Sequence, residues 1–186
     1  VHEMNCVETL ARVNVLCVDK TGTITRPDMS VSDVVFLKDN VGKLIAGVAG
    51  NMDDDNETMK AIKDYYHITD RDNSAERVYS FSSQNKYSGA VLDGRCYIFG
   101  APEYVLLDTY AEYEDIFERY SGHGERILVF GECVGDPCGN IIEEAVNPYA
   151  FIILENEIRD TAKETFGYFA SQGVDIVVIS GDNPVC

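Results

Sequence analysis

The chain has 186 residues, enough for one large domain or two small ones, and hydrophobic residues make up 45% of it, which is ample for a core. Its 32 acidic and 15 basic residues give a formal net charge of −17. Nucleic acid and anionic lipid both need a positively charged surface, so this balance argues against either as a general partner. An anionic ligand would have to be held by a local group of lysine, arginine and backbone N–H donors.

No apolar stretch approaches the roughly 18 residues that a membrane helix needs. The chain begins with Val1 rather than Met and shows no signal peptide, so we expect a piece of a longer protein. Six cysteines lack C-x-x-C spacing and three histidines are isolated, so a zinc site is not expected. Cys133 and Cys138 flank a Gly-Asp-Pro turn and can meet, but a reduced, cytosolic chain is the simpler interpretation.

The first predicted strand covers residues 13–18 and ends at the polar loop 19–23. The strand is nearly continuous in apolar residues, which is typical of a parallel strand covered on both faces. Residues 31–37 predict a second strand. Residues 51–66 predict a helix, because acidic residues in its first turn suit the helix dipole.

Residues 87–100 form two alternating runs around Asp93-Gly94, a strong signal for a β-hairpin with a type I′ turn. Pro102 is well placed for the first turn of a helix, and a further helix is expected near residues 110–120. Residues 126–134 then return to strand. Hairpins mixed with helices predict an α+β unit built on an antiparallel sheet.

The last segment begins with another apolar strand at residues 149–155. Thr161 and Glu164 have capping-box spacing and open a predicted helix that ends at Gly173, and a final strand precedes Ser180. A strand, a helix and a strand of these lengths predict a right-handed parallel crossover. We therefore expect an α/β domain formed by residues 1–31 and 148–186, split by an α+β domain of residues 32–147.

Two of the predicted strands end in reactive groups. Ligands of open parallel sheets bind beyond the carboxyl ends of the strands. If the strand that ends at Asp19 and the strand that ends at Ser180 are neighbours, one crevice holds two carboxylates, several hydroxyl groups, Lys20 and glycine-exposed backbone N–H groups. Such a pocket suits a phosphoryl group with Mg²⁺. Asp19 is then a nucleophile that forms an aspartyl-phosphate.

The stretch Asp-Lys-Thr-Gly-Thr-Ile-Thr at residues 19–25 resembles the phosphorylation motif of the P-type (E1–E2) cation-transporting ATPases, a membrane branch of the haloacid dehalogenase-like superfamily. The resemblance implies a Rossmann-like phosphorylation (P) domain split by a nucleotide-binding (N) domain. It implies catalytic roles for Asp19, Lys20, Thr21 and Asp182, and phosphate binding by Thr21, Gly22, Thr23, Ser180 and Gly181. Mg²⁺ would be held by Asp19 and the backbone carbonyl of Thr21, with a further ligand missing from this chain.

Other stretches resemble the family's nucleotide domain, in the same order. Residues 81–89 resemble the segment whose phenylalanine stacks on adenine, and a phenylalanine face is a tolerant platform for a purine. Residues 100–103 resemble the Gly-Ala-Pro-Glu motif, residues 124–126 a segment whose arginine reaches the phosphates, and residues 156–159 the Asp-x-x-Arg hinge. The resemblance implies ATP and Mg²⁺ as cofactors and nucleotide binding by Phe81, Ser83, Lys86, Gly100, Ala101, Arg126 and Arg159.

Three departures from the family pattern change these expectations. Phe99 replaces the lysine before Gly-Ala-Pro-Glu, so we expect weaker binding of the ATP phosphates or packing of adenine between two aromatic rings. Asn156 replaces the hinge aspartate and removes a charge. The actuator domain, the membrane helices and a later magnesium motif do not occur here. We therefore expect a monomeric, soluble fragment from the cytoplasmic side of a bacterial transporter, with the rest of that transporter as its partner, weak nucleotide binding and little turnover.

Two alternatives remain. A free-standing phosphatase of the same superfamily commonly carries a second acid two residues after the nucleophile, where this chain has Thr21, which cannot do an acid's work. A nucleotide-binding module without chemistry fits the isolated chain, because magnesium ligands are missing. A P-loop kinase is excluded, since no G-x-x-x-x-G-K-[ST] stretch exists. The transported ion is not indicated, because ion selectivity lies in membrane residues that this chain lacks.

Overall fold

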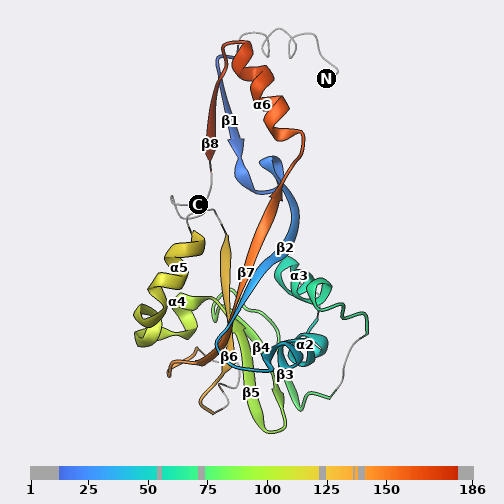
Figure 1. Ribbon diagram of the computed structural model, residues 1–186, viewed down its shortest axis with the longest axis vertical. Coiled ribbons are helices and arrows are strands. Elements are labelled where there is room, and N and C mark those ends of the chain that lie inside the picture. The colour runs from blue at the N-terminus through green and yellow to red at the C-terminus, as the bar shows by residue number, and fades with distance from the viewer. Residues whose placement is uncertain are drawn as a thin grey trace. The chain divides into compact units, whose positions relative to one another are not determined.

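The computed structural model describes residues 13–53, 56–70, 74–121, 125–135, 137 and 141–179. The chain divides into two units, one formed by residues up to Asp28 and from Asn156, the other by Met29–Glu155. It passes between them twice, along strands β2 (Thr25–Phe36) and β7 (Asn147–Ile158) (Figure 1). The domain borders predicted at 31/32 and 147/148 stay a prediction. None of the helices in the described ranges is long and apolar enough to cross a bilayer.

The first unit contains a parallel pair of strands, β1 (Val15–Asp19) and β8 (Asp175–Ile179). The register sets Asp19 opposite Ile179, so the two carboxyl ends lie at the same edge. Helix α6 (Ala162–Ser171) precedes β8 and is followed by Gly173 with φ +76°. The predicted strand pairing and the predicted glycine at the helix end are therefore confirmed.

Two expectations for this unit are wrong. Strand β1 is not covered on both faces within the described residues, since Val15 is 46% exposed and Val178 on the neighbouring β8 is 51% exposed. Thr161 does not form the predicted capping box, because its side chain makes no capping hydrogen bond. Its backbone already has helical angles, φ −80° and ψ −10°, whereas a capping residue normally has extended ones.

The second unit is built on a six-stranded sheet with the order β2-β7-β6-β5-β4-β3. Every pair from β7 to β3 is antiparallel. The remaining strands of this sheet are β3 (Arg77–Tyr79), β4 (Tyr87–Leu92), β5 (Arg95–Gly100) and β6 (Arg126–Glu132). The β4–β5 hairpin turns at Asp93 and Gly94, whose φ angles of 50° and 71° are both positive, as a type I′ turn requires. The predicted hairpin and α/β fold class are thus confirmed.

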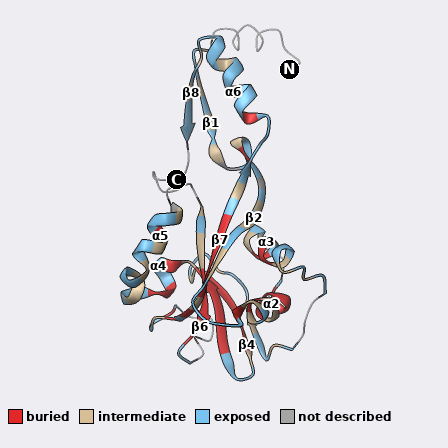
Figure 2. Ribbon diagram, viewed as in Figure 1, coloured by how far each residue is buried: buried red, intermediate tan, exposed pale blue. Residues whose placement is uncertain are grey.

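Helices cover both faces of this sheet and bury two separate cores (Figures 1 and 2). Helices α2 (Val41–Asn51) and α3 (Glu57–Tyr65) pack on one face. Helix α4 (Pro102–Val105), a 3₁₀ helix (Leu107–Tyr113) and helix α5 (Glu114–Ser121) lie on the other. On β7, Ile152 faces the first core and Ile153 the second, and both are fully buried.

The parallel crossover predicted between residues 149–155 and the last strand is wrong. Residues 149–155 belong to β7, which pairs antiparallel with β6 in the second unit, while β8 pairs with β1. The apolar run had a different cause: β7 lies inside a sheet whose two faces are both covered, so residues pointing either way are buried. A continuous apolar strand indicates burial on two faces and does not by itself indicate parallel pairing.

Three helical segments differ in detail from the prediction. Helix α2 was not predicted, and the helix expected over residues 51–66 is the shorter α3. The helix expected near residues 110–120 is a 3₁₀ segment followed by α5. Of the two cysteines that flank a turn, Cys133 is buried in the second core, and Cys138 lies outside the described residues.

Candidate functional site

The polar loop after β1 folds into one π-helical turn, Lys20–Ile24. Asp19 is the last residue of β1 and is exposed, with extended backbone angles of φ −74° and ψ 144°. Gly22 has φ +76°, a conformation that costs other residues energy. The strand therefore delivers the Asp19 carboxylate to its tip, with the backbone of the turn immediately beyond it.

Thr25 fixes the shape of this turn from inside. Its side chain is 3% exposed, and its Oγ1 accepts a hydrogen bond from the Gly22 N–H at 3.2 Å. The same hydroxyl donates to the Lys20 carbonyl at 3.4 Å. Thr25 is the last residue of the seven-residue motif, and no role was expected for it from the sequence. Its membership in the seven-residue match was the signal available.

Arg159 reaches the same turn from the far end of the sequence. Its Nη2 donates to the Gly22 carbonyl at 3.0 Å, and its backbone N–H donates to the Ile24 carbonyl at 3.0 Å. The amide of Asn156, the residue in place of the usual hinge aspartate, donates to the Asp28 carbonyl at 3.2 Å. The hinge segment thus contacts the phosphorylation motif through neutral acceptors.

The predicted phosphorylation residues come together only in part. Asp19, Lys20, Gly22 and Thr23 lie at the tip of β1, as does the backbone of Thr21. Ser180, Gly181 and Asp182 lie outside the described residues, although β8 ends one residue before them at Ile179, beside Asp19. Within the described ranges, no three His, Cys, Asp or Glu side chains gather to hold a metal. The Asp19 carboxylate and a backbone carbonyl are oxygen ligands of the kind that Mg²⁺ takes, and the magnesium site expected at Asp19 and Thr21 stays a prediction.

A second group of candidates lies in the other unit, in the loop after β3. Phe81 is 47% exposed, so its ring presents a face to solvent. The chain then turns at Ser82, whose Oγ accepts the N–H groups of Gln84 and Asn85 at 3.2 Å each. Lys86 closes the turn by donating its N–H to the Ser82 carbonyl at 2.8 Å, and it has φ +59°.

The start of α4 adjoins this loop. The Ala101 N–H donates to the Lys86 carbonyl at 3.2 Å, and the Lys86 ammonium lies 6.0 Å from the centre of the Tyr104 ring. Gly100 is needed for packing, because a Cβ there would lie 2.3 Å from Cγ1 of Val105. The loop and the helix start are therefore held together as one surface.

The strand register gathers the remaining candidates at the same end of the sheet. Gly100 pairs with Tyr87 on β4 and with Val129 on β6. Arg126 is the exposed first residue of β6, three residues before Val129. Phe81, Ser83, Lys86, Gly100, Ala101 and Arg126 thus belong to one unit and to one end of its sheet, whereas Arg159 belongs to the other unit. An exposed aromatic ring and two cations at one end of a sheet are the residue types that a purine nucleotide needs, and nucleotide binding by these residues stays a prediction.

Phe99 does not supply a second exposed ring for adenine. It is 2% exposed and packs on Phe130, with the ring centres 4.8 Å apart. The expectation of two aromatic faces around adenine is therefore not met by this residue. The aromatic ring near the Lys86 ammonium is that of Tyr104, which is 47% exposed.

The chain combines a parallel strand pair, which carries Asp-Lys-Thr-Gly-Thr at the tip of one strand, with a second unit inserted between the two strands. This second unit carries the loop with the exposed Phe81. No protein-family model matches the chain. Several curated proteins, however, are similar to the chain in sequence. The chain is 38% identical over 187 residues to the calcium-transporting ATPase CtpE of Mycolicibacterium smegmatis, covering 100% of this chain and 23% of that protein. It is 35% identical over 193 residues to the probable cation-transporting ATPase exp7 of Streptococcus pneumoniae, covering 100% of this chain and 24% of that protein.

Solved structures agree in fold. The catalytic domain of the CPx-ATPase CopB-B has a TM-score of 0.65 at 13% identity, over 99% of this chain and 60% of that one. A zinc-transporting PIB-type ATPase has a TM-score of 0.64 at 20% identity, over 96% of this chain and 27% of that one. The chain is thereby identified as a homologue of a segment of the P-type cation-transporting ATPases, and its fold is similar to that of the CPx-ATPase catalytic domain. It spans about a quarter of the length of these curated relatives.

Proposed function

We propose that this chain is the nucleotide-binding region and part of the phosphorylation region of a P-type cation-transporting ATPase, on the cytoplasmic side of the membrane. The observation that carries the proposal is Asp19 at the tip of a parallel strand, followed by a turn whose backbone is held by Thr25 and Arg159. The membrane and actuator regions of the same transporter are its partners. One of the named relatives is called a calcium-transporting ATPase and the other only a cation-transporting ATPase, so no ion is assigned.

In this proposal a carboxylate oxygen of Asp19 attacks the γ-phosphorus of ATP. A bond forms between that oxygen and phosphorus, the bond to the bridging oxygen breaks, and ADP leaves. Lys20, Thr21, Gly22 and Thr23 hold the phosphoryl oxygens, together with Ser180, Gly181 and Asp182. Mg²⁺, bound to Asp19 and the Thr21 carbonyl, would neutralise charge on the phosphoryl group.

The second unit supplies the nucleotide. Phe81 stacks on the adenine ring, Lys86 and Arg126 provide positive charge for the phosphates, and Ser83, Gly100 and Ala101 line the site. A contact of Arg159, which belongs to the first unit, with the nucleotide is proposed from the family resemblance alone. The local cations are needed because the chain as a whole carries a charge of −17 and repels a triphosphate.

Nucleotide binding is tested by substituting Phe81. Because base–aromatic stacking contributes about 1–3 kcal/mol, Phe81→Ala should weaken ATP binding to this chain roughly tenfold or more. A titration of the chain with ATP, followed by NMR chemical shifts, measures the affinity of each variant. Phe36→Ala is the matched control, since Phe36 is also exposed, at 52%, but lies outside the nucleotide loop. Equal affinity of Phe81→Ala and the wild type would defeat the proposed base contact.

Phosphoryl transfer is tested at Asp19. In the full-length protein, γ-labelled ATP should give an acid-stable, hydroxylamine-labile phosphoprotein that Asp19→Asn abolishes. Labelling that survives this substitution would overturn the role of Asp19. Hydrolysis of a simple phosphomonoester by the wild type would point to the phosphatase alternative instead.

A further inference from the structure

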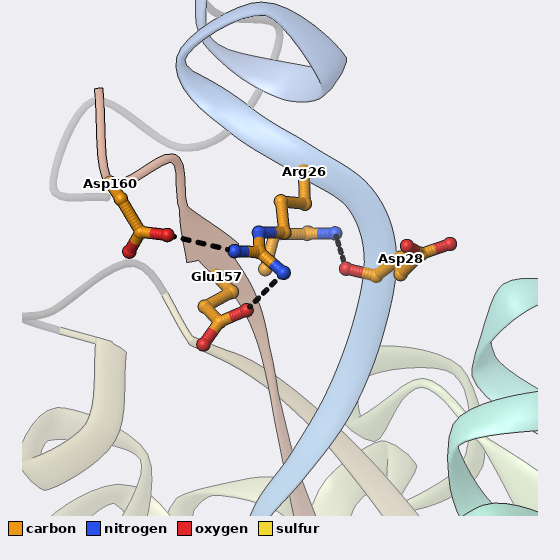
Figure 3. A network of polar contacts seen from close by, with 5 residues as sticks. Arg26, Asp28, Glu157 and Asp160 are labelled. Carbon is orange, nitrogen blue, oxygen red and sulfur yellow. Dashed lines mark hydrogen bonds and ion pairs between the residues drawn. The ribbon is translucent and has the colours of Figure 1, made fainter. Parts of the chain in front are cut away.

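An ion-pair network lies beside the phosphorylation motif and has no role in the function proposed above. Arg26, the residue after the motif, places Nη1 3.3 Å from Oε2 of Glu157. Its Nη2 donates to Oδ2 of Asp160 at 3.0 Å (Figure 3). Glu157 and Asp160 stand on either side of Arg159 in the sequence. One guanidinium therefore holds both acidic neighbours of the arginine that contacts the loop.

Arg159 holds the loop through bonds to neutral acceptors. Its guanidinium donates to the Gly22 carbonyl, while the Gly22 N–H donates to Thr25. Both polar backbone groups of Gly22 are thus engaged, at a residue with φ +76°. The Arg159 guanidinium thus contacts the loop at a residue only three positions after Asp19.

A competition follows from the charges of the segment. A hydrogen bond from guanidinium to a carboxylate is about twice as strong as one to a neutral oxygen. Glu157 and Asp160 are close enough in sequence to offer such bonds to Arg159. Without another cation to occupy them, they would draw its guanidinium away from the Gly22 carbonyl. Arg26 pairs with both carboxylates, so the Arg159 guanidinium remains bonded to the Gly22 carbonyl.

We propose that Arg26 is a positioning residue for the phosphorylation loop, acting by keeping Glu157 and Asp160 away from Arg159. The catalytic consequence rests on the function proposed above, whereas the arrangement of the four side chains does not. All of them belong to the same unit. The pairs are exposed, with side-chain exposures of 45% for Arg26, 67% for Glu157 and 87% for Asp160, so a moderate, salt-sensitive effect is expected.

The first test measures the loop itself by amide hydrogen exchange in this chain. In Arg26→Gln, the amides of Gly22 and Arg159 should exchange about threefold to tenfold faster than in the wild type, and 1 M salt should shrink the difference. Lys163→Gln is the control, because it removes a positive charge from α6 of the same unit without touching the network. Unchanged exchange in Arg26→Gln would overturn the proposal.

The second test asks whether Arg26 acts by keeping Glu157 and Asp160 from Arg159 or by supporting the loop through its ion pairs. In the full-length protein, Arg26→Gln should slow phosphoenzyme formation about threefold to tenfold. Adding Glu157→Gln and Asp160→Asn to Arg26→Gln should restore most of the rate, because no carboxylate is left to compete for Arg159. If Arg26 instead supports the loop through the ion pairs themselves, phosphoenzyme formation would remain slow in the triple variant. That result would contradict the competition mechanism.

The two proposals can fail separately. If Asp19→Asn is still phosphorylated, the proposed function falls, while the exchange result for Arg26→Gln still decides the arrangement of the network. If Asp19→Asn abolishes labelling and Arg26→Gln changes neither exchange nor rate, the function stands and the role of Arg26 is wrong.

Discussion

At the scale of single residues, burial separates side chains that look alike in the sequence. Phe81 precedes the β4–β5 hairpin and Phe99 lies on its second strand, and Phe81 is 47% exposed whereas Phe99 is 2% exposed. Phe99 packs on Phe130 in the core beneath α2 and α3, at a position where the family usually has a lysine. This position therefore contributes packing here, and in the proposed function the positive charge for the nucleotide comes from Lys86 and Arg126.

Tyr149 combines a hydrogen bond to a charged group with partial burial. Its hydroxyl donates to the Glu132 carboxylate, and the Lys38 ammonium lies 3.7 Å from its ring centre. The hydrogen bond to Glu132, followed by burial, raises the pKa of Tyr149 to about 12. The neutral phenol is thus favoured in the folded state. Stability from this group is complete below the ordinary pKa of about 10 and is lost as pH rises toward 12.

The corresponding prediction is that Tyr149→Phe lowers the free energy of unfolding by about 1 kcal/mol at pH 8, since a hydrogen bond to a charged group is lost. The difference from the wild type should narrow between pH 10 and 12. Urea unfolding at several pH values measures both. Tyr168→Phe is the control, because Tyr168 is 63% exposed. A difference that stays constant across this range would contradict the assignment.

At the scale of elements, two glycines show how the same substitution has opposite effects. Gly47 lies inside α2, and a Cβ added there would meet nothing within 4 Å. Gly89 lies in the middle of β4, where a Cβ would lie 2.2 Å from the Tyr97 carbonyl oxygen and 2.9 Å from the Ile98 Cα. Those are backbone atoms of the paired strand, so neither can move without disturbing the sheet.

We expect Gly47→Ala to raise the free energy of unfolding by up to about 1 kcal/mol, because alanine loses less conformational freedom in a helix than glycine does. Gly89→Ala should lower it by about 1–3 kcal/mol, because it overpacks a closed strand pair. Thermal or urea unfolding measures each. Stabilisation by Gly89→Ala would mean that β4 and β5 approach less closely than described.

At the scale of the whole molecule, the two units differ in how well they cover their strands. The second unit buries residues 150–154 of β7 between two cores, with Ile152 and Ile153 at 0% exposure. The first unit, within the described residues, leaves Val177 45% exposed and Ile179 57% exposed on β8. Because local opening costs less where fewer apolar contacts must be broken, the two units should not be equally protected.

We therefore predict that backbone amides of β1 and β8 exchange at least about tenfold faster than amides of β6 and β7. Hydrogen exchange followed by mass spectrometry or NMR resolves the two sets. The β4–β5 hairpin provides an internal reference within the covered sheet. Equal protection of both sheets would show that the exposed apolar residues of β8 are covered in solution.

The sequence by itself determined what depends on neighbouring residues. An apolar run that ends in Asp-Lys-Thr-Gly-Thr specifies a strand with a carboxylate at its tip, and Asp93-Gly94 specifies a tight turn because both residues tolerate positive φ. The stretches that resemble the family's phosphorylation motif and nucleotide-binding segment could be recognised for the same reason, because each is short and continuous in the sequence.

Only the tertiary structure decided what depends on partners far along the chain. An apolar strand is buried in a parallel or an antiparallel sheet alike, so the pattern of β7 could not reveal that it pairs with β6. Arg26 and Asp160 are separated by 134 positions, and Arg159 and Gly22 by 137. No local pattern encodes such a contact, because it exists only once folding has brought the two ends of the first unit together.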